Sequence, residues 1–389
     1  MESTRKIVTS SPENSETPLD SVASWVTPNR LFFVRNHFDP PAAADRATWE
    51  VSLDGLVARP LQWTFAQLAA LPQHTVFATV ECAGNGRSFL TEKAEGVQWG
   101  AGAIGHAEWS GVRVADLLRS AGLAPGALEI VFEGADRGIE HGETMNFSRS
   151  LPLEKALHPD TLIALHMNGE WLEPNHGAPL RLFVPGWYGV ASVKWLRRLT
   201  VIDHAYQGFF QTVKYSINRP TASGRQRVPL GPGAVKSEIL FPRASETLGL
   251  GTTRIAGVAW AGEDTVTRVD VSTDGGRTWQ AAHLKGVQQP YSWCQWECLW
   301  TVSTPGDYTI MARARTAGGQ VQPAGYDADN LSYIINFVVP RTVWVAARPA
   351  KDANFADDGT WHTDMETFAE ENTRRPLDLE LALTAGDGI

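Results

Sequence analysis

The chain has 389 residues and a formal net charge of −9, with 43% hydrophobic and 20% charged residues. This composition is typical of a globular protein of about two or three domains. No lysine- or arginine-rich block with interleaved aromatic residues occurs, which argues against nucleic acid as a partner. No apolar run is long enough to cross a bilayer, so no membrane partner is expected.

The N-terminal stretch is polar and rich in Ser, Glu and Pro, and we expect residues 1–24 to be a disordered lead. It contains neither the apolar core of a signal peptide nor paired arginines. As written, the sequence therefore indicates a cytoplasmic protein. A leader missing from its start would indicate the periplasm instead.

Between about residues 30 and 210, short β-branched runs mix with short helical segments and Gly/Pro turns. Strands are predicted over residues 31–34, 49–55, 75–80, 128–134, 162–167 and 199–202. A short helix is predicted after a Thr64 cap, and the apolar spacing over 111–118 predicts another. Regular strand–helix–strand units are not repeated, so the predicted fold class is α+β.

The stretch Glu81–Arg87 follows the predicted strand 75–80 and places Cys82 at its C-terminal mouth, where loops often carry chemistry. Its glycines let the backbone approach a ligand closely, and Arg87 supplies a fixed cation for an anion. A buried, unreactive cysteine before a tight turn is the competing interpretation.

Cationic or protonatable side chains end or interrupt several apolar strands of the same region. They are Arg35, His37, Arg87, His176, Arg181 and Lys194. Because burying an uncompensated cation is costly and a bound anion would offset that cost, these residues predict an internal anionic ligand. A thiolate among them would serve as a nucleophile or as a ligand of a soft transition metal, and the residues alone leave both open.

A linker rich in Pro, Gly and Ser is predicted at residues 218–235. After it, the pattern changes from mixed strands and helices to repeated strands. Five strand-like runs then follow over 255–260, 266–272, 278–280, 293–300 and 308–315. They predict a β-sandwich over 236–345. Residues 346–389 form an acidic C-terminal tail, interpreted as a surface arm or as a segment that crosses to a second subunit.

Two other motifs are given structural interpretations. Gly100–Gly105 matches the dinucleotide-binding spacing, but the residues before it make a poor buried strand, so we do not assign a nicotinamide site. Cys294 and Cys298 share one face of a predicted strand with Trp296, which favours sandwich core over metal binding.

Short motifs in a fixed order resemble the sulfite oxidase family of molybdenum–pterin enzymes over about residues 31–340. They are Phe33-Val34-Arg35-Asn36-His37, Glu81-Cys82-Ala83-Gly84-Asn85, Gly96-Val97-Gln98-Trp99, Phe132-Glu133-Gly134-Ala135-Asp136, Met167-Asn168-Gly169, His176-Gly177-Ala178-Pro179-Leu180-Arg181, Val184-Pro185-Gly186, Val193-Lys194-Trp195-Leu196, Ala259-Trp260 and Val269-Asp270-Val271-Ser272-Thr273-Asp274-Gly275-Gly276. So many ordered matches are more specific than any single motif.

The resemblance implies a mixed α/β molybdenum-cofactor domain over 25–217, followed by an immunoglobulin-like domain over 236–345 that forms a homodimer. It implies molybdenum–molybdopterin as the cofactor and Cys82 as the protein ligand of the metal. The implied cofactor contacts are Phe33, Val34, Arg35, Asn36, His37, Cys82, Asp136, His176, Arg181, Ser192, Val193 and Lys194. The implied catalytic residues are Cys82, Arg35, Arg87, Trp99 and Phe147.

Two departures from the family bear on the substrate. Phe147 stands where sulfite oxidases carry a pocket tyrosine, and a further pocket arginine is replaced around Ser332 or Tyr333. Losing one charge-assisted donor from a buried anion site costs about 1.5–3 kcal/mol. Gly86 also replaces an arginine found in some relatives, and Arg149 is a candidate to compensate for the lost charge.

The expected function is therefore oxidation of a small sulfur oxyanion such as sulfite by oxygen-atom transfer. The sequence contains no Cys-x-x-Cys-His haem motif, so electrons are expected to pass to a separate acceptor such as a cytochrome. The alternatives are a sulfane dehydrogenase-like enzyme with a substrate other than sulfite, a non-catalytic dimeric binding scaffold, and a hydrolase that uses Cys82 as nucleophile.

Overall fold

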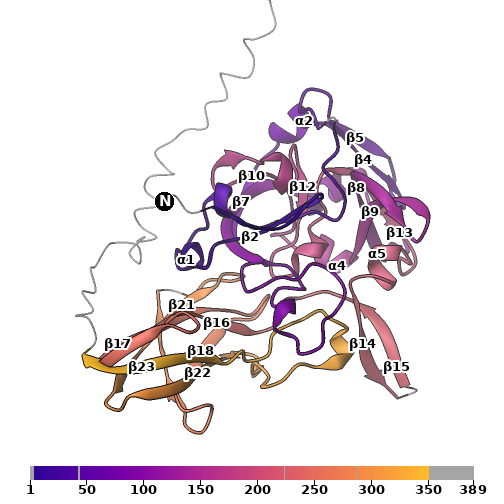
Figure 1. Cartoon of the computed structure of the whole chain (residues 1–389). Coiled ribbons are helices and arrows are strands. Elements are labelled where there is room, and N and C mark those ends of the chain that lie inside the picture. The colour runs from indigo at the N-terminus through magenta and orange to yellow at the C-terminus, as the bar shows by residue number, and fades with distance from the viewer. Residues whose placement is uncertain (1–3, 43, 223, 287, 350–389) are drawn as a thin grey trace, which may run out of the picture. The chain divides into compact units, whose positions relative to one another are not determined.

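The computed structural model describes residues 4–42, 44–222, 224–286 and 288–349. These residues form mostly strands with few, short helices (Figure 1), so both elements of the predicted α+β class are present but β-structure dominates. No helix within the described ranges is long and apolar enough to cross a membrane. Most of the C-terminal tail predicted at residues 346–389 lies outside the described residues. Its first residues, up to Pro349, belong to strand β23.

One five-stranded sheet has the order β5-β4-β13-β8-β9, in which β4 and β13 are parallel and the other neighbours antiparallel. Its strands are β4 (Glu50–Gly55), β5 (Leu61–Thr64), β8 (Glu129–Glu140), β9 (Glu143–Pro152) and β13 (Leu196–Ile202). Alternate residues of β4 and β8 are buried, as expected for strands with one face on a core.

A second five-stranded sheet is antiparallel throughout and has the order β11-β10-β7-β6, with β12 beside β10. Its strands are β6 (His74–Glu81), β7 (Ile104–Arg113), β10 (Leu162–Met167), β11 (Glu170–Trp171) and β12 (Arg181–Phe183). Strand β10 is buried along its whole length, which explains its continuous apolar sequence.

The helices of the described chain are short. They are α1 (Leu19–Val22), α2 (Phe65–Ala69), α3 (Val114–Ala121), α4 (Leu153–Ala156) and α5 (Phe209–Thr212), with 3₁₀ turns η1 (Asn29–Leu31), η2 (Arg87–Phe89), η3 (Pro174–His176), η4 (Gly189–Ala191) and η5 (Ala328–Asn330). The predicted Thr64 cap is confirmed by a reciprocal capping box with Gln67. The helix predicted over 111–118 begins only at Val114, because residues 111–113 still pair with β10.

The described part of the predicted N-terminal lead, residues 4–24, is not disordered. Strands β1 (Lys6–Ser10) and β2 (Glu13–Glu16) form a hairpin, and β2 pairs with β3 (Val34–Arg35). The polar composition was misleading because Asn14 is buried and its side chain makes hydrogen bonds inside the fold. Of the run predicted as a strand over 31–34, only Val34 belongs to a strand, and Leu31 ends the 3₁₀ turn η1.

The predicted linker at 218–235 is also ordered. Strands β14 (Ser216–Thr221) and β15 (Gly224–Pro229) pair antiparallel from Ser216 opposite Pro229 to Thr221 opposite Gly224. Arg227 fastens the hairpin by donating to the Ser216 hydroxyl and to the Val213 carbonyl. The predicted domain boundary at 217 therefore falls inside a strand.

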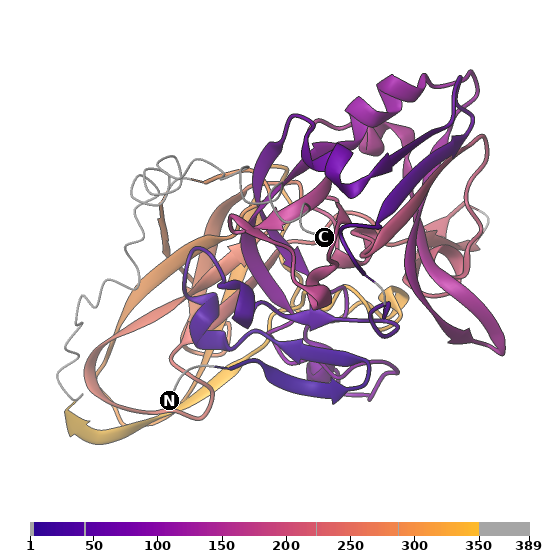
Figure 2. The same ribbon diagram turned by 90° about the horizontal axis from the view of Figure 1, so that it is seen from above.

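The C-terminal strands form an eight-stranded sheet in the order β19-β18-β22-β23-β17-β21-β20, with β16 beside β17. They are β16 (Lys236–Phe241), β17 (Thr247–Trp260), β18 (Val266–Ser272), β19 (Gln280–Ala281), β20 (His283–Lys285), β21 (Cys294–Val302), β22 (Gly306–Thr316) and β23 (Arg341–Pro349). Both ribbon views show them gathered together (Figures 1 and 2). Cys294 and Cys298 pack with Trp296 in their core, as predicted. Their description as an immunoglobulin-like sandwich stays a prediction.

Candidate active site

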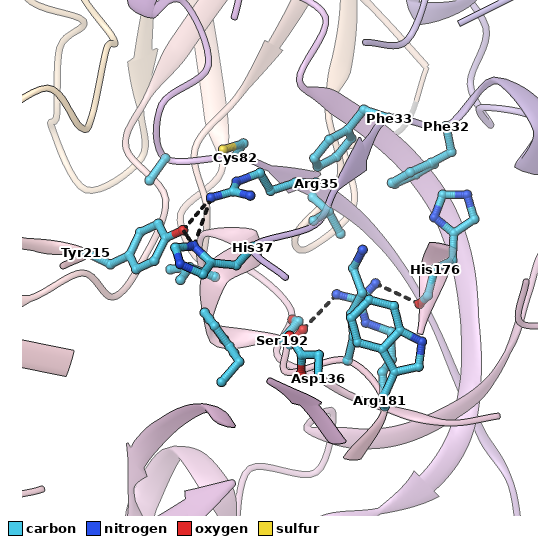
Figure 3. A pocket seen from close by; sticks show the side chains of 17 residues that line it. Phe32, Phe33, Arg35, His37, Cys82, Asp136, His176, Arg181, Ser192 and Tyr215 are labelled. Atoms are coloured by element: carbon cyan, nitrogen blue, oxygen red, sulfur yellow. Dashed lines mark hydrogen bonds between the residues drawn. The ribbon is translucent and has the colours of Figure 1, made fainter. Parts of the chain in front are cut away.

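A pocket brings together most of the side chains that the sequence singled out. They are Phe33, Arg35, His37, Cys82, Asp136, Phe147, His176, Arg181, Ser192 and Lys194. They come from strands and loops far apart in the sequence, and Figure 3 shows several of them turned toward one space. Arg35, Cys82 and Tyr215 occupy one part of it, and Asp136, His176 and Arg181 another.

Cys82 follows the last residue of β6, as the sequence predicts. Its N–H donates to the Ala103 carbonyl (2.9 Å), and its own carbonyl accepts from Asn85 N–H (2.8 Å). These bonds fix the backbone on both sides of the thiol, which is free and 9% exposed. The turn after it needs Gly86 at φ +95°, a left-handed conformation that glycine adopts readily.

Arg35 lines the pocket at the end of β3 and is held by hydrogen bonds. Its Nη2 donates to the Tyr215 hydroxyl (2.8 Å), and its Nη1 donates to Asn14 Oδ1 (3.2 Å) and to the Asn36 carbonyl. Burial alone would lower the pKa of this guanidinium, but Tyr215 and Cys82 outweigh that effect and raise it. Arg35 therefore stays a cation in the pocket.

Tyr215 is a pocket residue that sequence reasoning missed. Its hydroxyl lies 2.8 Å from Arg35 Nη2 and 3.1 Å from His37 Nδ1. No periodicity or motif marked it, because it sits between α5 and β14, just before the linker predicted at residues 218–235. Its ring contacts the Phe147 ring edge-on, with a centroid distance of 6.3 Å. The Tyr215 phenol therefore lies close to Phe147, the position at which the sulfite oxidases carry a pocket tyrosine.

The other part of the pocket carries buried cations. Arg181 donates to the carbonyls of His176 (3.1 Å) and Ser192 (2.8 Å), and burial lowers its pKa to about 9. Lys194 donates to the Asn175 carbonyl (2.6 Å) and to Asn36 Oδ1 (2.5 Å), and burial lowers its pKa well below the usual value. A bound anion would offset the cost of burying this charge.

Asp136 lies beside these cations and has an unused acceptor. Its Oδ1 is buried and has no hydrogen-bond partner among the described residues. Burial raises the pKa of its carboxyl to about 7, although Lys194 acts in the opposite direction. Such an atom is suited to a ligand that carries N–H donors.

Arg87 and Trp99 were predicted to face the substrate, but neither lines this pocket. The Arg87 guanidinium donates to the carbonyls of Val97 (2.7 Å) and Ser332 (3.0 and 3.2 Å), which take up its Nη1, Nη2 and Nε. Trp99 is fully buried in a hydrophobic cluster that includes Cys82 and Phe33. Both side chains therefore contribute to the packing around the Cys82 loop and do not line the pocket.

Three more predicted cofactor contacts also lie outside the lining. Val34 and Val193 are buried in the core, and Asn36 uses its side chain to hold Lys194 and Asn175. Their direct contact with a cofactor stays a prediction. Arg149 does not compensate for a lost pocket charge, because its guanidinium donates to the carbonyls of Phe210 and Leu230 inside the fold.

Comparison with known families agrees with this arrangement. Residues 37–210 match the model of the oxidoreductase molybdopterin binding domain, and residues 233–339 match that of the Mo-co oxidoreductase dimerisation domain. The fold and the pocket thus define a molybdopterin-dependent oxidoreductase.

Comparison with individual relatives shows to which family of molybdopterin-dependent oxidoreductases the chain belongs. The chain is 36% identical to sulfite oxidase of Gallus gallus over 80% of its own length and 71% of the relative's, and 32% identical to sulfite oxidase of Arabidopsis thaliana over 85% and 91%. The structure of the sulfane dehydrogenase SoxCD from Paracoccus pantotrophus matches with a TM-score of 0.77 and 32% identity over 87% of each chain. The chain belongs to the sulfite oxidase family, and its cofactor is molybdenum–molybdopterin.

The residues around the pocket fit this cofactor chemically. The unpartnered Asp136 oxygen suits the N–H groups of a pterin, and the buried cations suit its phosphate. The Cys82 thiol supplies a soft donor of the kind that transition metals prefer. The predictions of family and cofactor are therefore confirmed.

Proposed function

We propose that the chain oxidises a small sulfur oxyanion such as sulfite and passes two electrons to a separate acceptor such as a cytochrome. The observation that carries this proposal is the Cys82 thiol and the Arg35 guanidinium on the walls of one pocket. When bound, the molybdenum cofactor supplies a two-electron redox centre that exchanges an oxygen atom with water.

The chain's own residues bind and orient. We assign Cys82 as the metal ligand and Asp136, Arg181 and Lys194 as the groups that hold the pterin and its phosphate. Arg35 binds the substrate anion, because its charge is buried and its position is fixed by Tyr215 and Asn14. Phe147 is an apolar wall, with its ring 4.6 Å from that of Phe210.

A sulfur substrate other than sulfite is the second candidate. Arg87 is committed to two backbone carbonyls and Phe147 has no hydroxyl, so the pocket offers fewer donors to a doubly charged oxyanion than the resemblance implied. Each missing charge-assisted donor weakens anion binding by about 1.5–3 kcal/mol. This favours a sulfane dehydrogenase-like reaction, as in the SoxCD relative.

The proposal is tested with protein produced in a host that makes the cofactor. We expect close to one molybdenum per chain and reduction of a dye when a sulfur substrate is added. Faster reduction with sulfite than with a persulfide would support the oxyanion, and the reverse order would support the second candidate. Molybdenum-loaded protein that reduces the dye with neither compound would contradict the function.

The dimer is proposed on separate grounds. Residues 233–339 match a family model described as a dimerisation domain, which supports a homodimer built through the C-terminal sheet. The non-catalytic scaffold is disfavoured, because the pocket retains a free thiol and several buried cations. A binding module without chemistry has no evident use for them.

A further inference from the structure

A line of hydrogen bonds leads from the pocket toward the surface. The Tyr215 hydroxyl and the His37 ring line the pocket, and His37 Nδ1 lies 3.1 Å from the hydroxyl oxygen. His37 Nε2 lies 2.6 Å from Glu140 Oε1, at the end of β8. Lys214 Nζ lies 2.9 Å from both oxygens of Glu140. The side chains become more exposed along this line, from 11% at His37 to 15% at Glu140 and 37% at Lys214.

One assignment of donors and acceptors satisfies the whole line. Arg35 has only donors, so its Nη2 donates to the Tyr215 oxygen and to His37 Nδ1 (3.2 Å). His37 Nδ1 is therefore an acceptor, and it also accepts from the phenolic O–H of Tyr215. His37 Nε2–H then donates to the Glu140 carboxylate, which also accepts from Lys214. All the hydrogen bonds along this line therefore point outward, from the pocket to Glu140 (Figure 3 shows the inner part).

The charges around His37 favour a neutral ring. Burial lowers its pKa to about 4, and Arg35 and Lys214 act in the same direction, against the opposite effect of Glu140. The remaining neighbours are aromatic: the rings of Phe38, Phe147 and Phe210 lie 4.8, 6.0 and 4.7 Å from the His37 ring. A neutral imidazole with one bare nitrogen can accept a proton on one side and release one on the other.

We propose that Tyr215, His37 and Glu140 form the path by which protons leave the pocket during turnover. This inference rests on the proposed function. Oxidation of sulfite, with water as the source of the added oxygen atom, yields sulfate, two protons and two electrons, and the electrons pass to the separate acceptor. Each proton has to leave a pocket whose walls near His37 are aromatic.

The transfer conserves every atom. A proton arriving at the Tyr215 oxygen forms a new O–H bond while the original phenolic proton moves to His37 Nδ1. The Nε2 proton of His37 moves to Glu140 and from there to solvent water. Rotation of the hydroxyl and return of the imidazole to its first tautomer reset the path for the second proton.

The resemblance implied His37 as a cofactor contact, and the structure gives it different polar partners. Both of its ring nitrogens already have protein partners, Tyr215 and Arg35 at Nδ1 and Glu140 at Nε2. The ring can still pack against a cofactor through its faces. Its hydrogen-bonding capacity, however, is committed to the path.

The outer end of the path is tested by Glu140→Gln, with Glu143→Gln as the matched control. Glu143 stands opposite Glu140 in the β8–β9 hairpin and is exposed. In molybdenum-loaded protein, we expect Glu140→Gln to slow substrate-dependent proton release, followed with a pH indicator, by about tenfold to a hundredfold, and to enlarge the effect of D₂O. Equal rates and equal solvent isotope effects in the two variants would overturn the proposal.

A second measurement needs no turnover. In cofactor-free protein labelled with ¹⁵N-histidine, we expect His37 to be neutral with its proton on Nε2. We expect Tyr215→Phe to shift the Nδ1 signal by removing one of its two donors, the other being Arg35. A proton on Nδ1, or no shift in the variant, would overturn the path. If wild-type protein binds molybdenum but oxidises no sulfur compound, the proposed function fails while these histidine signals still decide the path.

Discussion

Asp136 is a single residue at which the pocket differs from an ordinary protein interior, where buried polar atoms have hydrogen-bond partners. Its carboxyl is buried beside Lys194, yet Oδ1 has no partner within the part of the chain that the structure describes. An unsatisfied buried acceptor costs about 1–3 kcal/mol, so the folded protein carries this cost until a ligand donates to the oxygen. The residue thus lowers the stability of the cofactor-free protein at the position where we propose that the pterin binds.

The raised pKa of Asp136 predicts a pH dependence of stability in cofactor-free protein. The unfolded chain loses the Asp136 proton near its ordinary pKa of 3.8, whereas the folded chain keeps it up to about 7. Between these values the folded state binds more protons, so the free energy of unfolding falls as pH rises, by at most about 1.4 kcal/mol per pH unit. Urea unfolding at about pH 5 and about pH 7 measures the slope.

Asp136→Asn provides the comparison, because asparagine does not titrate. We expect the stability of the variant to fall less between the two pH values than that of wild-type protein. Above about pH 7 the contribution of Asp136 is already lost and the two curves run parallel. Identical slopes below that pH would show that the carboxyl is not protonated in the folded state.

Residue types and motif order were enough to locate much of the pocket, including Cys82, Arg35 and Asp136. They could not give the direction of Arg87, because a guanidinium at that position reaches either the pocket or the Ser332 carbonyl. They also missed Tyr215, whose place depends on a contact with Arg35 across 180 residues of sequence.

At the scale of elements, the segment 331–334 has the least regular backbone near the pocket. Leu331, Ser332 and Ile334 have φ values of 51°, 71° and 51°. These values lie in the left-handed region, which residues other than glycine rarely adopt. Ile334 N–H donates to the Ala83 carbonyl (2.8 Å), and the Ser332 carbonyl accepts from Arg87. This conformation is fixed by its contacts with the Cys82 loop, so local sequence could not predict it.

Long apolar strands were predictable from sequence, and polar strands were not. Strands β6 and β10 follow from β-branched and apolar runs, but β2 is wholly polar and β1, β14 and β15 are mostly polar. Their stability comes from tertiary hydrogen bonds. Asn14, for example, accepts from Asn36 N–H (3.0 Å) and from Arg35.

Strand β16 contacts the end of β6 through a buried ion pair. Lys236 Nζ lies 3.3 Å from Glu81 Oε1, both side chains are buried, and Trp260 Nε1 donates to Glu81 Oε2 (2.9 Å). We expect Lys236→Met to lower the free energy of unfolding by about 3–5 kcal/mol, because it leaves Glu81 buried without a counter-charge. Urea unfolding measures the loss.

An exposed pair supplies the control. Arg243→Met removes a surface partner of Asp20 and is expected to cost at most about 1 kcal/mol. Adding Glu81→Gln to Lys236→Met removes the unpaired charge and is expected to recover part of the stability. A loss in Lys236→Met no larger than in Arg243→Met would show that the buried pair does not hold the two strands together.

At the scale of the whole molecule, the C-terminal region makes direct contacts with the loop that carries Cys82. Lys236, Ser332 and Ile334 all contact the stretch Glu81–Arg87. The Tyr333 ring contacts the Tyr215 ring in a tilted arrangement, with ring centroids 5.5 Å apart. The region that matches a dimerisation domain is therefore also a support for the catalytic pocket. The order of motifs predicted both regions, but contacts between them depend on tertiary packing that sequence order does not encode.

The central claim is that Cys82 binds molybdenum at the centre of this pocket. X-ray absorption at the molybdenum edge, on loaded wild-type protein and on Cys82→Ser, tests it most directly, with Cys298→Ser as a control for a cysteine in the C-terminal core. We predict one fewer sulfur ligand at the metal in Cys82→Ser and an unchanged wild-type spectrum in Cys298→Ser. The same sulfur shell in Cys82→Ser and wild-type protein would contradict the account.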